Sequence, residues 1–261
     1  MHGSLLEIQR WQTDESEIWV NSWPKVSAVL ICPSGGEKRL PVIDYEVKLF
    51  ALTKEACRGL LNSQNLFDGR HRIDFTAARE TIWPVIEGEA QSCGYDVKTE
   101  ETTAQLMYLP DAVDIPDMQD IPEGMTLGDL HPRYSSRLAP LWAYGPSPAE
   151  TDLYMSGVIS SFPSLAVHDQ STDELLAWMI CYEDGAMGHL YVCPSVRRRG
   201  LARLLVTRLA AKIRERGQTP FIYIEPSNKV SYNLHSSLGF VLVEEKVSWI
   251  SCLRQSRVDL S

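Results

Sequence analysis

The chain has 261 residues, a length that fits one large domain or two small ones. Its hydrophobic content of 44% is ordinary for a globular protein with a sizeable core, and its formal net charge of −9 argues against general nucleic-acid binding, which needs basic surfaces. No apolar run reaches the roughly 18 residues of a membrane span. The N-terminus has neither a secretory apolar region nor an Arg-rich transit segment. We therefore expect a cytoplasmic protein that binds neither nucleic acid nor membrane.

The cysteines are spread along the chain without the C-x-x-C spacing of a metal site or a redox pair. This scatter predicts reduced, mostly buried thiols and no metal centre. There are six of them: Cys32, Cys57, Cys93, Cys181, Cys193 and Cys252.

The first part of the chain mixes predicted strands with predicted helices. Strands are predicted over residues 18–23, 28–32, 45–52, 71–75 and 102–109. Helices are predicted over 53–61, where Thr53 is the N-cap, and over 76–93, which Gly94 ends. The segment 109–124 holds three prolines and five acidic residues and reads as an extended linker. We predict an N-terminal half at 1–109, a linker at 110–123 and a C-terminal half at 124–261.

The second part begins with helices and continues with strands. Helices are predicted over 129–144, which Pro140 kinks, and over 149–161. Strands at 165–168, 175–182 and 187–193 follow, the last two joined by a hairpin turn at 183–185. A helix from Gly200 to about Gly217, a strand at 221–225, a helix at 228–238 and a strand at 240–250 complete the chain. This order predicts a mixed α+β fold.

The segment from Tyr191 to Arg203 reads Y-V-C-P-S-V-R-R-R-G-L-A-R, which predicts a strand, a tight basic loop and a helix. The small residues Gly200 and Ala202 let a ligand approach the helix N-terminus, where free N–H groups and the helix dipole favour anions. Arginine adds bidentate phosphate donors. The segment therefore indicates a ligand that carries a pyrophosphate, although a basic stretch can also be a solvated helix face.

Two motifs at the expected separation resemble the GNAT acyltransferase superfamily. Val192-x-Pro-x-x-Arg197-x-x-Gly200-x-Ala202 resembles its acyl-CoA signature, [QR]-x-x-G-x-[GA]. The segment from Asn228 to Phe240 resembles its N-x-x-A-x-x-L-Y-x-x-L-G-F motif. W-V-N-S-W-P at 19–24 and A-V-L-I-C-P at 28–33 are similar to a region of glycine N-acyltransferase-like proteins.

This narrower resemblance covers nearly the whole chain. It implies two GNAT-like halves, each a mixed, mostly antiparallel sheet flanked by helices, with the CoA motif in the C-terminal half only. It also makes a mitochondrial location an alternative to the cytoplasm.

The resemblance implies that acyl-CoA is the co-substrate. A splayed strand would offer the backbone of residues 190–192, the basic loop would hold the pyrophosphate, and Asn228 would either bind the pantetheine arm or serve as a plain N-cap. The residues implied are Leu190, Tyr191, Val192, Arg197, Arg198, Arg199, Gly200, Leu201, Ala202, Arg203, Asn228, Ser231 and His235.

The sequence offers several candidates for the catalytic groups. His235 falls where many GNAT proteins carry a tyrosine that protonates the thiolate, and Tyr232 is a rival donor. By alignment, Ala186 replaces the glutamate that serves as general base in glycine N-acyltransferases. His189 and the turn acids Glu183 and Asp184 remain as candidates, as does a water relay.

The acceptor pocket is expected between the two helices that open the C-terminal half. Trp142, Tyr144 and Tyr154 could line it, although aromatic residues at such positions are more often core. Arg133 and Arg137 could hold a carboxylate or be merely exposed.

These observations predict an N-acyltransferase that moves an acyl group from acyl-CoA to a small amine, for example glycine or another amino acid. Two alternatives stay open. A non-catalytic acyl-CoA-binding sensor is favoured by the missing glutamate at position 186, and a protein N-acetyltransferase would need an open acceptor groove. The sequence does not predict an oligomeric state.

Overall fold

The computed structural model describes residues 16–33, 45–99, 103–115, 120–142 and 147–255. The N-terminal elements are β1 (Ser16–Val20), β2 (Ala28–Pro33), β3 (Glu46–Ala51), α2 (Lys54–Ser63), β4 (Arg72–Arg79), η1 (Glu80–Ile82), α3 (Trp83–Ser92), β5 (Tyr95–Thr99) and β6 (Ala104–Tyr108). Then follow β7 (Met125–Gly128), η2 (Pro132–Tyr134), α4 (Ser135–Leu138), η3 (Ala139–Leu141), α5 (Pro148–Ser161), β8 (Ser164–Asp169), β9 (Leu175–Cys181), β10 (Met187–Val192), η4 (Pro194–Val196), α6 (Leu201–Glu215), β11 (Phe221–Ile224), α7 (Lys229–Ser237) and β12 (Val241–Arg254).

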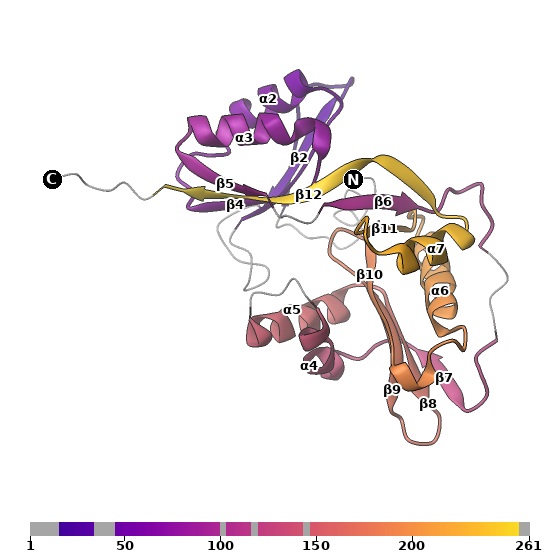
Figure 1. Ribbon diagram of the computed structural model, residues 1–261. Coiled ribbons are helices and arrows are strands. Elements are labelled where there is room, and N and C mark those ends of the chain that lie inside the picture. The colour runs from indigo at the N-terminus through magenta and orange to yellow at the C-terminus, as the bar shows by residue number, and fades with distance from the viewer. Residues whose placement is uncertain (1–15, 34–44, 100–102, 116–119, 143–146, 256–261) are drawn as a thin grey trace.

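The described strands join into one sheet in the order β1-β2-β3-β4-β12-β6-β11-β10-β9-β8-β7, with β5 paired to β12 (Figure 1). Most neighbouring strands are antiparallel, whereas β3–β4 and β10–β11 are parallel. The predicted mixed α+β class, with a mostly antiparallel sheet flanked by helices, is confirmed.

The two halves exchange strands. Strand β6 pairs with β11 and with the first part of β12, inside the C-terminal half of the sheet. The second part of β12 pairs with β4 and β5, inside the N-terminal half. Figure 1 shows β12 running from one half into the other. The strand predicted at 102–109 is therefore present as β6 but does not close the N-terminal half. This pairing crosses the predicted division at 109 and 124, because β6 comes before it in the chain and the partners β11 and β12 come after it.

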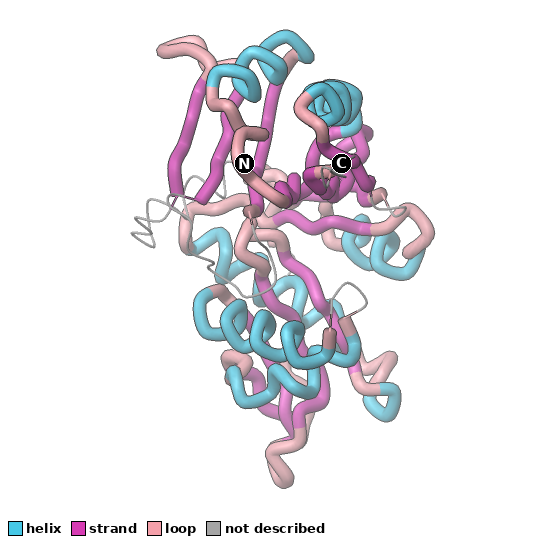
Figure 2. Tube along the Cα trace, turned by 90° about the vertical axis from the view of Figure 1, so that its left-hand side faces the viewer, coloured by secondary structure: helices cyan, strands magenta, loops and turns pink. Residues whose placement is uncertain are grey.

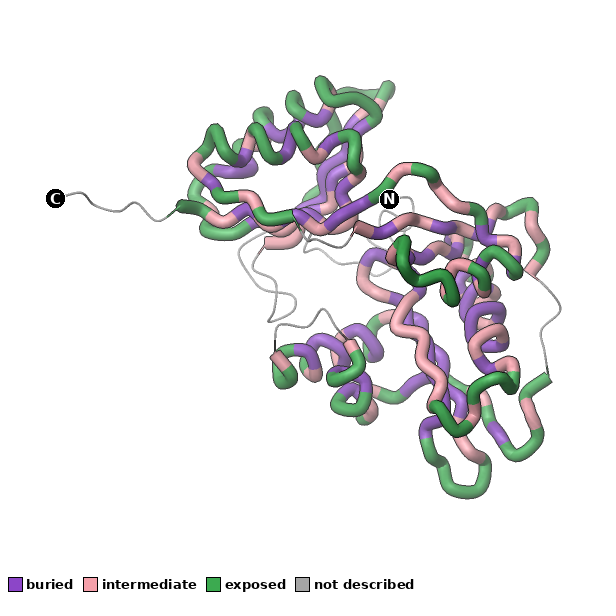
Figure 3. Tube along the Cα trace, viewed as in Figure 1, coloured by how far each residue is buried: buried purple, intermediate pink, exposed green. Residues whose placement is uncertain are grey.

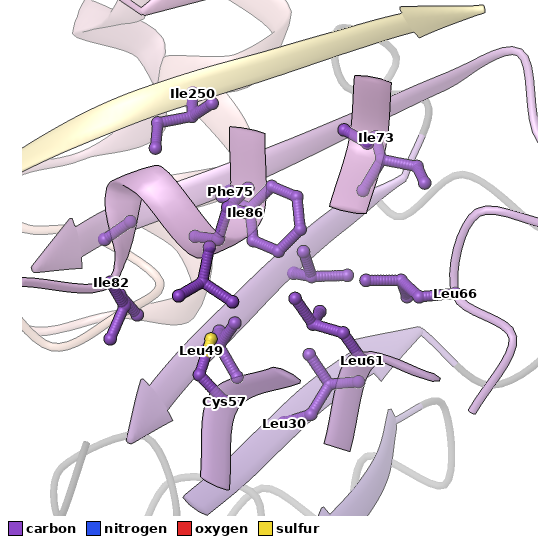
Figure 4. Packing of buried hydrophobic residues seen from close by; sticks show 14 of the residues in the cluster. Leu30, Leu49, Cys57, Leu61, Leu66, Ile73, Phe75, Ile82, Ile86 and Ile250 are labelled. Atoms are coloured by element: carbon purple, nitrogen blue, oxygen red, sulfur yellow. The ribbon is translucent and has the colours of Figure 1, made fainter. Parts of the chain in front are cut away.

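Helices α2 and α3 cover one face of the N-terminal part of the sheet. Their buried side chains meet Leu49 of β3, Phe75 of β4 and Ile250 of β12 in one apolar cluster (Figure 4). Thr53 caps α2 as predicted, because its hydroxyl accepts a hydrogen bond from the Ala56 N–H at 3.2 Å. The outward faces of both helices are exposed (Figure 3). Ile250 thus ties the C-terminal strand to the N-terminal core.

In the C-terminal half, helices pack on both faces of the sheet, as Figures 1 and 2 show. Alternate residues of β9 face opposite sides, so Trp178 and Ile180 join the cluster around α4 and α5. Met179 and Cys181 join the cluster around α6. Strand β9 is buried along its whole length, as expected for a central strand covered on both faces.

Some predicted elements differ from the structure. Residues 76–79 extend β4 instead of starting a helix, because Ala78 and Arg79 pair with β12, a partner that local sequence does not reveal. The helix predicted over 129–144 is a series of short turns within its described part, where Pro132 and Pro140 interrupt the backbone hydrogen bonds. Strands β5 and β7 were not predicted.

The predicted linker is held against the C-terminal half at its start. The Arg214 guanidinium donates to the carbonyl oxygens of Pro110 at 2.5 Å and Val113 at 2.7 Å. Arg214 is therefore a structural side chain rather than part of a solvated basic face.

All six cysteines are free, and four of them are buried. Among the described residues, no helix is both long enough and apolar enough to cross a membrane.

Candidate functional site

The basic loop between β10 and α6 has the backbone shape of an anion site. Arg198 and Gly200 both adopt positive φ, 63° and 81°, and Gly200 is the left-handed N-cap of α6. No side chain caps the first turn of α6, so its N–H groups are left for another acceptor. Arg197, Arg198 and Arg199 are all exposed, and the Arg197 Nε also donates to the Val192 carbonyl at 3.0 Å, a contact within the loop.

Strand β10 carries a bulge and parts from β11. Its pairing with β11 is limited to Met187 opposite Ile222. Its pairing with β9 shifts register between Gly188 and Tyr191, and His189 between them has φ of 47°. Tyr191 and Val192 therefore pair with β9 on one side, whereas none of residues 190–192 is paired with the described strand β11 on the other. This splay is the geometry expected for residues 190–192.

Asn228 is the N-cap of α7. Its side-chain oxygen accepts a hydrogen bond from the Ser231 N–H at 3.1 Å. The predicted capping role is confirmed, and contact of Asn228 with a ligand stays a prediction. Both residues line the cavity described next.

A cavity of about 470 Å³ lies where the two halves meet, within the usual range for small-molecule sites. Strands β3, β4 and β12 contribute one part of its lining, and α5, β10, β11 and the β9–β10 hairpin contribute the other. The residues that matter for its chemistry are Glu46, Arg72, Asp74, Thr76, Trp142, Tyr154, Tyr182, Glu183, Asp184, His189, Tyr223, Glu225, Asn228, Ser231 and Trp249.

Glu183 is the most strongly perturbed carboxylate of this cavity. Its Oε2 accepts a hydrogen bond from the Tyr154 hydroxyl at 2.6 Å. Burial, followed by the nearby negative charge of Glu46, raises the pKa of Glu183 to about 7, although Lys48 and the Tyr154 hydrogen bond oppose the rise. A carboxylate with a pKa near 7 can accept and return a proton at neutral pH. From the sequence, His189 was the preferred candidate for the general base and Glu183 a weaker one. The surroundings of Glu183 in the structure favour Glu183 instead.

His189 lines the same cavity, but one of its ring nitrogens is engaged. The Trp178 Nε1–H can only donate, so His189 Nδ1 accepts this hydrogen bond at 3.1 Å and the ring proton lies on Nε2. Burial lowers the pKa of His189 and keeps the ring neutral. These contacts hold the bulge in shape, and they make His189 a less suitable base than Glu183.

His235 lies in the core of the C-terminal half. Its Nδ1 is 2.8 Å from the Ser231 carbonyl oxygen, which can only accept, so Nδ1 carries the proton. Its Nε2 is buried without a hydrogen-bond partner among the described residues, and burial lowers its pKa to about 4. A neutral ring whose only N–H is already donated is poorly suited to protonate a thiolate. Tyr232, partly buried on the same core, stays a prediction for that role.

Two of the three aromatic residues predicted to line the acceptor pocket, Trp142 and Tyr154, lie together. Trp142 stacks on Tyr154 with ring centroids 5.1 Å apart, and Tyr182, not predicted, lies 6.3 Å from Trp142. Tyr144 lies outside the described residues. Arg133 pairs with Asp173 at 3.0 Å and Arg137 approaches Glu174 at 3.8 Å, and neither lines the cavity.

Sequence reasoning missed the contribution of the N-terminal half to the cavity. Glu46, Thr76 and Trp249 come from strands that reach the cavity only through long-range pairing. Glu46 was the one residue of this group that the sequence marked at all, because it is charged and lies at the start of a predicted strand. In the structure this strand, β3, has alternating burial.

Comparisons with known proteins agree with this architecture. Residues 164–250 match the family model of FR47-like proteins. The X-ray structure of a Drosophila protein aligns with a TM-score of 0.71 at 16% identity, covering 98% of this chain and 88% of its own. A tandem GNAT protein from the clavulanic acid biosynthesis pathway, solved without AcCoA, aligns with a TM-score of 0.55 at 13% identity over 98% and 89% of the two chains. A putative GNAT-family acetyltransferase from Novosphingobium aromaticivorans aligns at 0.53 and 16% identity over 97% of each chain. The chain therefore has the GNAT fold; its closer resemblance to glycine N-acyltransferase-like proteins stays a prediction.

Proposed function

We propose that this protein is an acyl-CoA-dependent N-acyltransferase that acylates the amine of a small acceptor bound in the cavity between its two halves. The observation that carries the proposal is Glu183, a carboxylate with a pKa of about 7 in the same cavity as the β10 bulge and the α7 cap. The GNAT fold and the FR47-like match support acyl-CoA as the donor. An amino acid such as glycine is the acceptor that the narrower resemblance implies.

The donor side of the proposal uses backbone groups. The uncapped first turn of α6 and the exposed Arg198 and Arg199 suit a pyrophosphate, since both supply hydrogen-bond donors and positive charge. The unpaired edge of β10 at residues 190–192 suits an amide-bearing arm and a thioester carbonyl. The residues present therefore fit acyl-CoA.

The acceptor side uses Glu183. An amine enters as its ammonium form, and the Glu183 carboxylate removes one proton from it. The free nitrogen then attacks the thioester carbonyl, so a C–N bond forms and the C–S bond breaks. The nitrogen loses its second proton as the amide forms, so two protons are released in all. Tyr232 is the proposed donor of a proton to the CoA thiolate; one of the two released protons restores the Tyr232 hydroxyl, and the other leaves to solvent.

The same residue favours an enzyme over a non-catalytic acyl-CoA sensor. The argument for a sensor was the alanine at position 186. Glu183, three residues earlier, supplies a carboxylate of suitable pKa within the cavity. A thiol-release assay with acetyl-CoA and a panel of small amines tests the proposal; release that depends on both substrates supports it, and acyl-CoA binding without release on any amine supports the sensor.

Charge reversal in the basic loop is expected to abolish acyl-CoA binding. Arg198→Glu combined with Gly200→Glu places two carboxylates at the N-terminus of α6, where they repel phosphate. Gly200 has φ of 81°, which disfavours a residue with a side chain, so Gly200→Glu also strains the backbone. Arg198→Glu alone changes the charge without replacing this glycine and is the second variant. We expect a loss of affinity of about 100-fold or more for the pair and a smaller loss for the single change, by isothermal titration calorimetry.

Lys54→Glu is a matched charge reversal at an exposed position on α2, in the other half. It should leave acyl-CoA affinity unchanged. Equal affinity of wild type and both loop variants, each with an unaltered circular dichroism spectrum, would refute the assignment of the loop.

The pH profile of the reaction should follow Glu183. We expect the acidic limb of kcat/KM to titrate near pH 7, because the base must be ionised to act. Glu46→Gln removes a charge that raises the pKa of Glu183 and should move the limb to lower pH. Tyr154→Phe removes a hydrogen bond that lowers this pKa and should move the limb to higher pH. Limbs that do not move in opposite directions would exclude Glu183 as the titrating group.

A further inference from the structure

We propose that Trp178 is a positioning residue for acyl transfer. Its hydrogen bond to His189 holds the bulge of β10, and the bulge sets the direction in which the backbone of residues 190–192 meets the thioester. This role rests on the proposed function. It falls to a side chain that is not among the described residues lining the cavity.

The bulge of β10 has an unusual backbone at its centre. Its register with β9 shifts between Gly188 and Tyr191, so the ladder is interrupted at residues 189–190. His189 has φ of 47°, a left-handed conformation that residues other than glycine adopt only occasionally. Such a conformation persists where the surrounding structure holds it in place. The shape of the bulge therefore depends on the side chains packed around it.

Trp178 supplies this support from the neighbouring strand β9. Its side chain is 0% exposed, and a buried indole N–H needs an acceptor. The acceptor is His189 Nδ1, 3.1 Å away. Burial lowers the pKa of His189, so the ring stays neutral and Nδ1 keeps the lone pair that this hydrogen bond requires. The Trp178 ring also stacks on Tyr191 with centroids 4.6 Å apart, so it contacts the residues on both sides of Leu190.

The ring of Trp178 is itself held by the helices behind β9. It lies in the apolar cluster that also contains Leu138 of α4 and Tyr154 and Met155 of α5. The hydroxyl of Tyr154 donates to Glu183 at 2.6 Å. One packed cluster therefore carries both the hydrogen bond to the proposed base and the hydrogen bond to the bulge.

A second aromatic ring lies against the start of the bulge. A Cβ placed on Gly188 would lie 2.3 Å from Cε2 of the Tyr182 ring, so this ring packs directly on the strand where the register begins to shift. The bulge is thus flanked by Tyr182 at its start and by Trp178 at its centre and end. Of these two contacts, only the one with Trp178 includes a hydrogen bond to the residue with positive φ.

The chemical consequence concerns the carbonyl oxygen of the thioester. Backbone N–H groups stabilise a developing oxyanion only when they point at it, and a displacement of about 1 Å can cost about 100-fold in rate. The pyrophosphate would lie elsewhere, at the uncapped first turn of α6. We therefore expect the Trp178–His189 hydrogen bond to act on the acyl group rather than on the affinity for CoA.

Trp178→Phe tests this role, because it keeps an aromatic ring to stack on Tyr191 and removes the N–H donor. The probe is acetyl-CoA labelled with ¹³C at its thioester carbonyl, observed by infrared difference spectroscopy, since hydrogen bonds to a carbonyl lower its stretching frequency. We expect a narrow band in the wild type and a broader band at higher frequency in Trp178→Phe. The Kd for CoA, by calorimetry, should stay as in the wild type. With the amine that the wild type acetylates fastest, kcat for thiol release should fall by about 100-fold.

Two substitutions of His189 separate the hydrogen bond from the backbone shape. Asparagine tolerates positive φ and its side-chain oxygen can accept from the indole, whereas glycine tolerates positive φ and offers no acceptor. His189→Asn should therefore give the wild-type band, and His189→Gly the band of Trp178→Phe. The matched control is Trp83→Phe, which removes an indole N–H that donates to the Ala78 carbonyl at 2.6 Å in the N-terminal half. It should change neither the band nor kcat.

The outcomes separate this role from the proposed function. The same band in wild type, Trp178→Phe and His189→Gly, with acetyl-CoA bound to each, would overturn the role of Trp178 and leave the proposed function intact. If the bands differ as expected but no amine supports thiol release, the role of Trp178 in orienting the thioester stands and the proposed function fails. Loss of CoA affinity in Trp178→Phe would show that this side chain supports the whole binding site, and would also overturn the specific role.

Discussion

Replacing Glu183 with glutamine is expected to lower kcat/KM at pH 7 by about 10²- to 10⁴-fold, the usual contribution of a general base. Glutamine keeps the shape of the side chain and still offers an oxygen to the Tyr154 hydroxyl, which donates to Glu183 at 2.6 Å. It cannot accept a proton from the acceptor amine. The loss should appear in kcat with little change in acyl-CoA affinity, because the change lies away from the basic loop.

The same variant is expected to be more stable than the wild type at neutral pH. The pKa of Glu183 is about 7 in the folded protein against a usual value of 4.5, so the folded state binds a proton that the unfolded state has lost between these values. The free energy of unfolding therefore falls as pH rises from about 4.5 to about 7 and levels off above, by up to about 3 kcal/mol in all. Glutamine has no charge to lose, and this part of the pH dependence disappears.

Urea unfolding at pH 5 and pH 8 checks this result. The wild type should lose stability between the two pH values by more than Glu183→Gln does, and the two proteins should be closest at pH 5. Glu87→Gln, at an exposed position on α3, is the control for a general loss of one negative charge. Full activity of Glu183→Gln would contradict the assignment of Glu183 as the general base. Lower stability of this variant than of wild type at pH 8 would contradict the raised pKa of Glu183.

The predictable part of the site is the part encoded by consecutive residues. The loop from Cys193 to Gly200 and the start of α6 follow from glycine, proline and a helical apolar pattern within one short segment, and the structure has them as expected. The N-cap at Asn228 is equally local.

The role of Glu183 as a base could not be predicted from consecutive residues. From sequence it is an acidic residue in a hairpin turn, an ordinary place for one. Its pKa is raised by burial against α5 and by Glu46 on β3, and both depend on how distant segments pack. Similarly, the helical prediction at 76–79 failed because the pairing of β4 with β12 overrides local propensity.

Ile250→Ala is expected to destabilise both halves together by about 2–5 kcal/mol, the usual cost of removing a buried isoleucine side chain. Ile250 is 2% exposed and packs in the N-terminal cluster with Phe75 and Ile86 (Figure 4). The strand that carries it begins in the other half, where Val241 and Leu242 pair with β6. Because β6 and β12 are exchanged, neither half keeps its full sheet once the other has unfolded.

Hydrogen exchange distinguishes a shared transition from two separate ones. In Ile250→Ala, the slowest-exchanging amides of β3, in the N-terminal core, and of β9, in the C-terminal core, should both lose protection by at least about 30-fold. Both sets of amides then exchange through one global opening. Val230→Ala, at a side chain on α7 that is 82% exposed, is the control and should change neither. Loss of protection in β3 with β9 unchanged would mean that the halves unfold independently despite the exchanged strands. Faster exchange in both would mean that the cavity between them is formed by one cooperative unit, so that the acceptor site and the acyl-CoA loop are stabilised by the same core contacts.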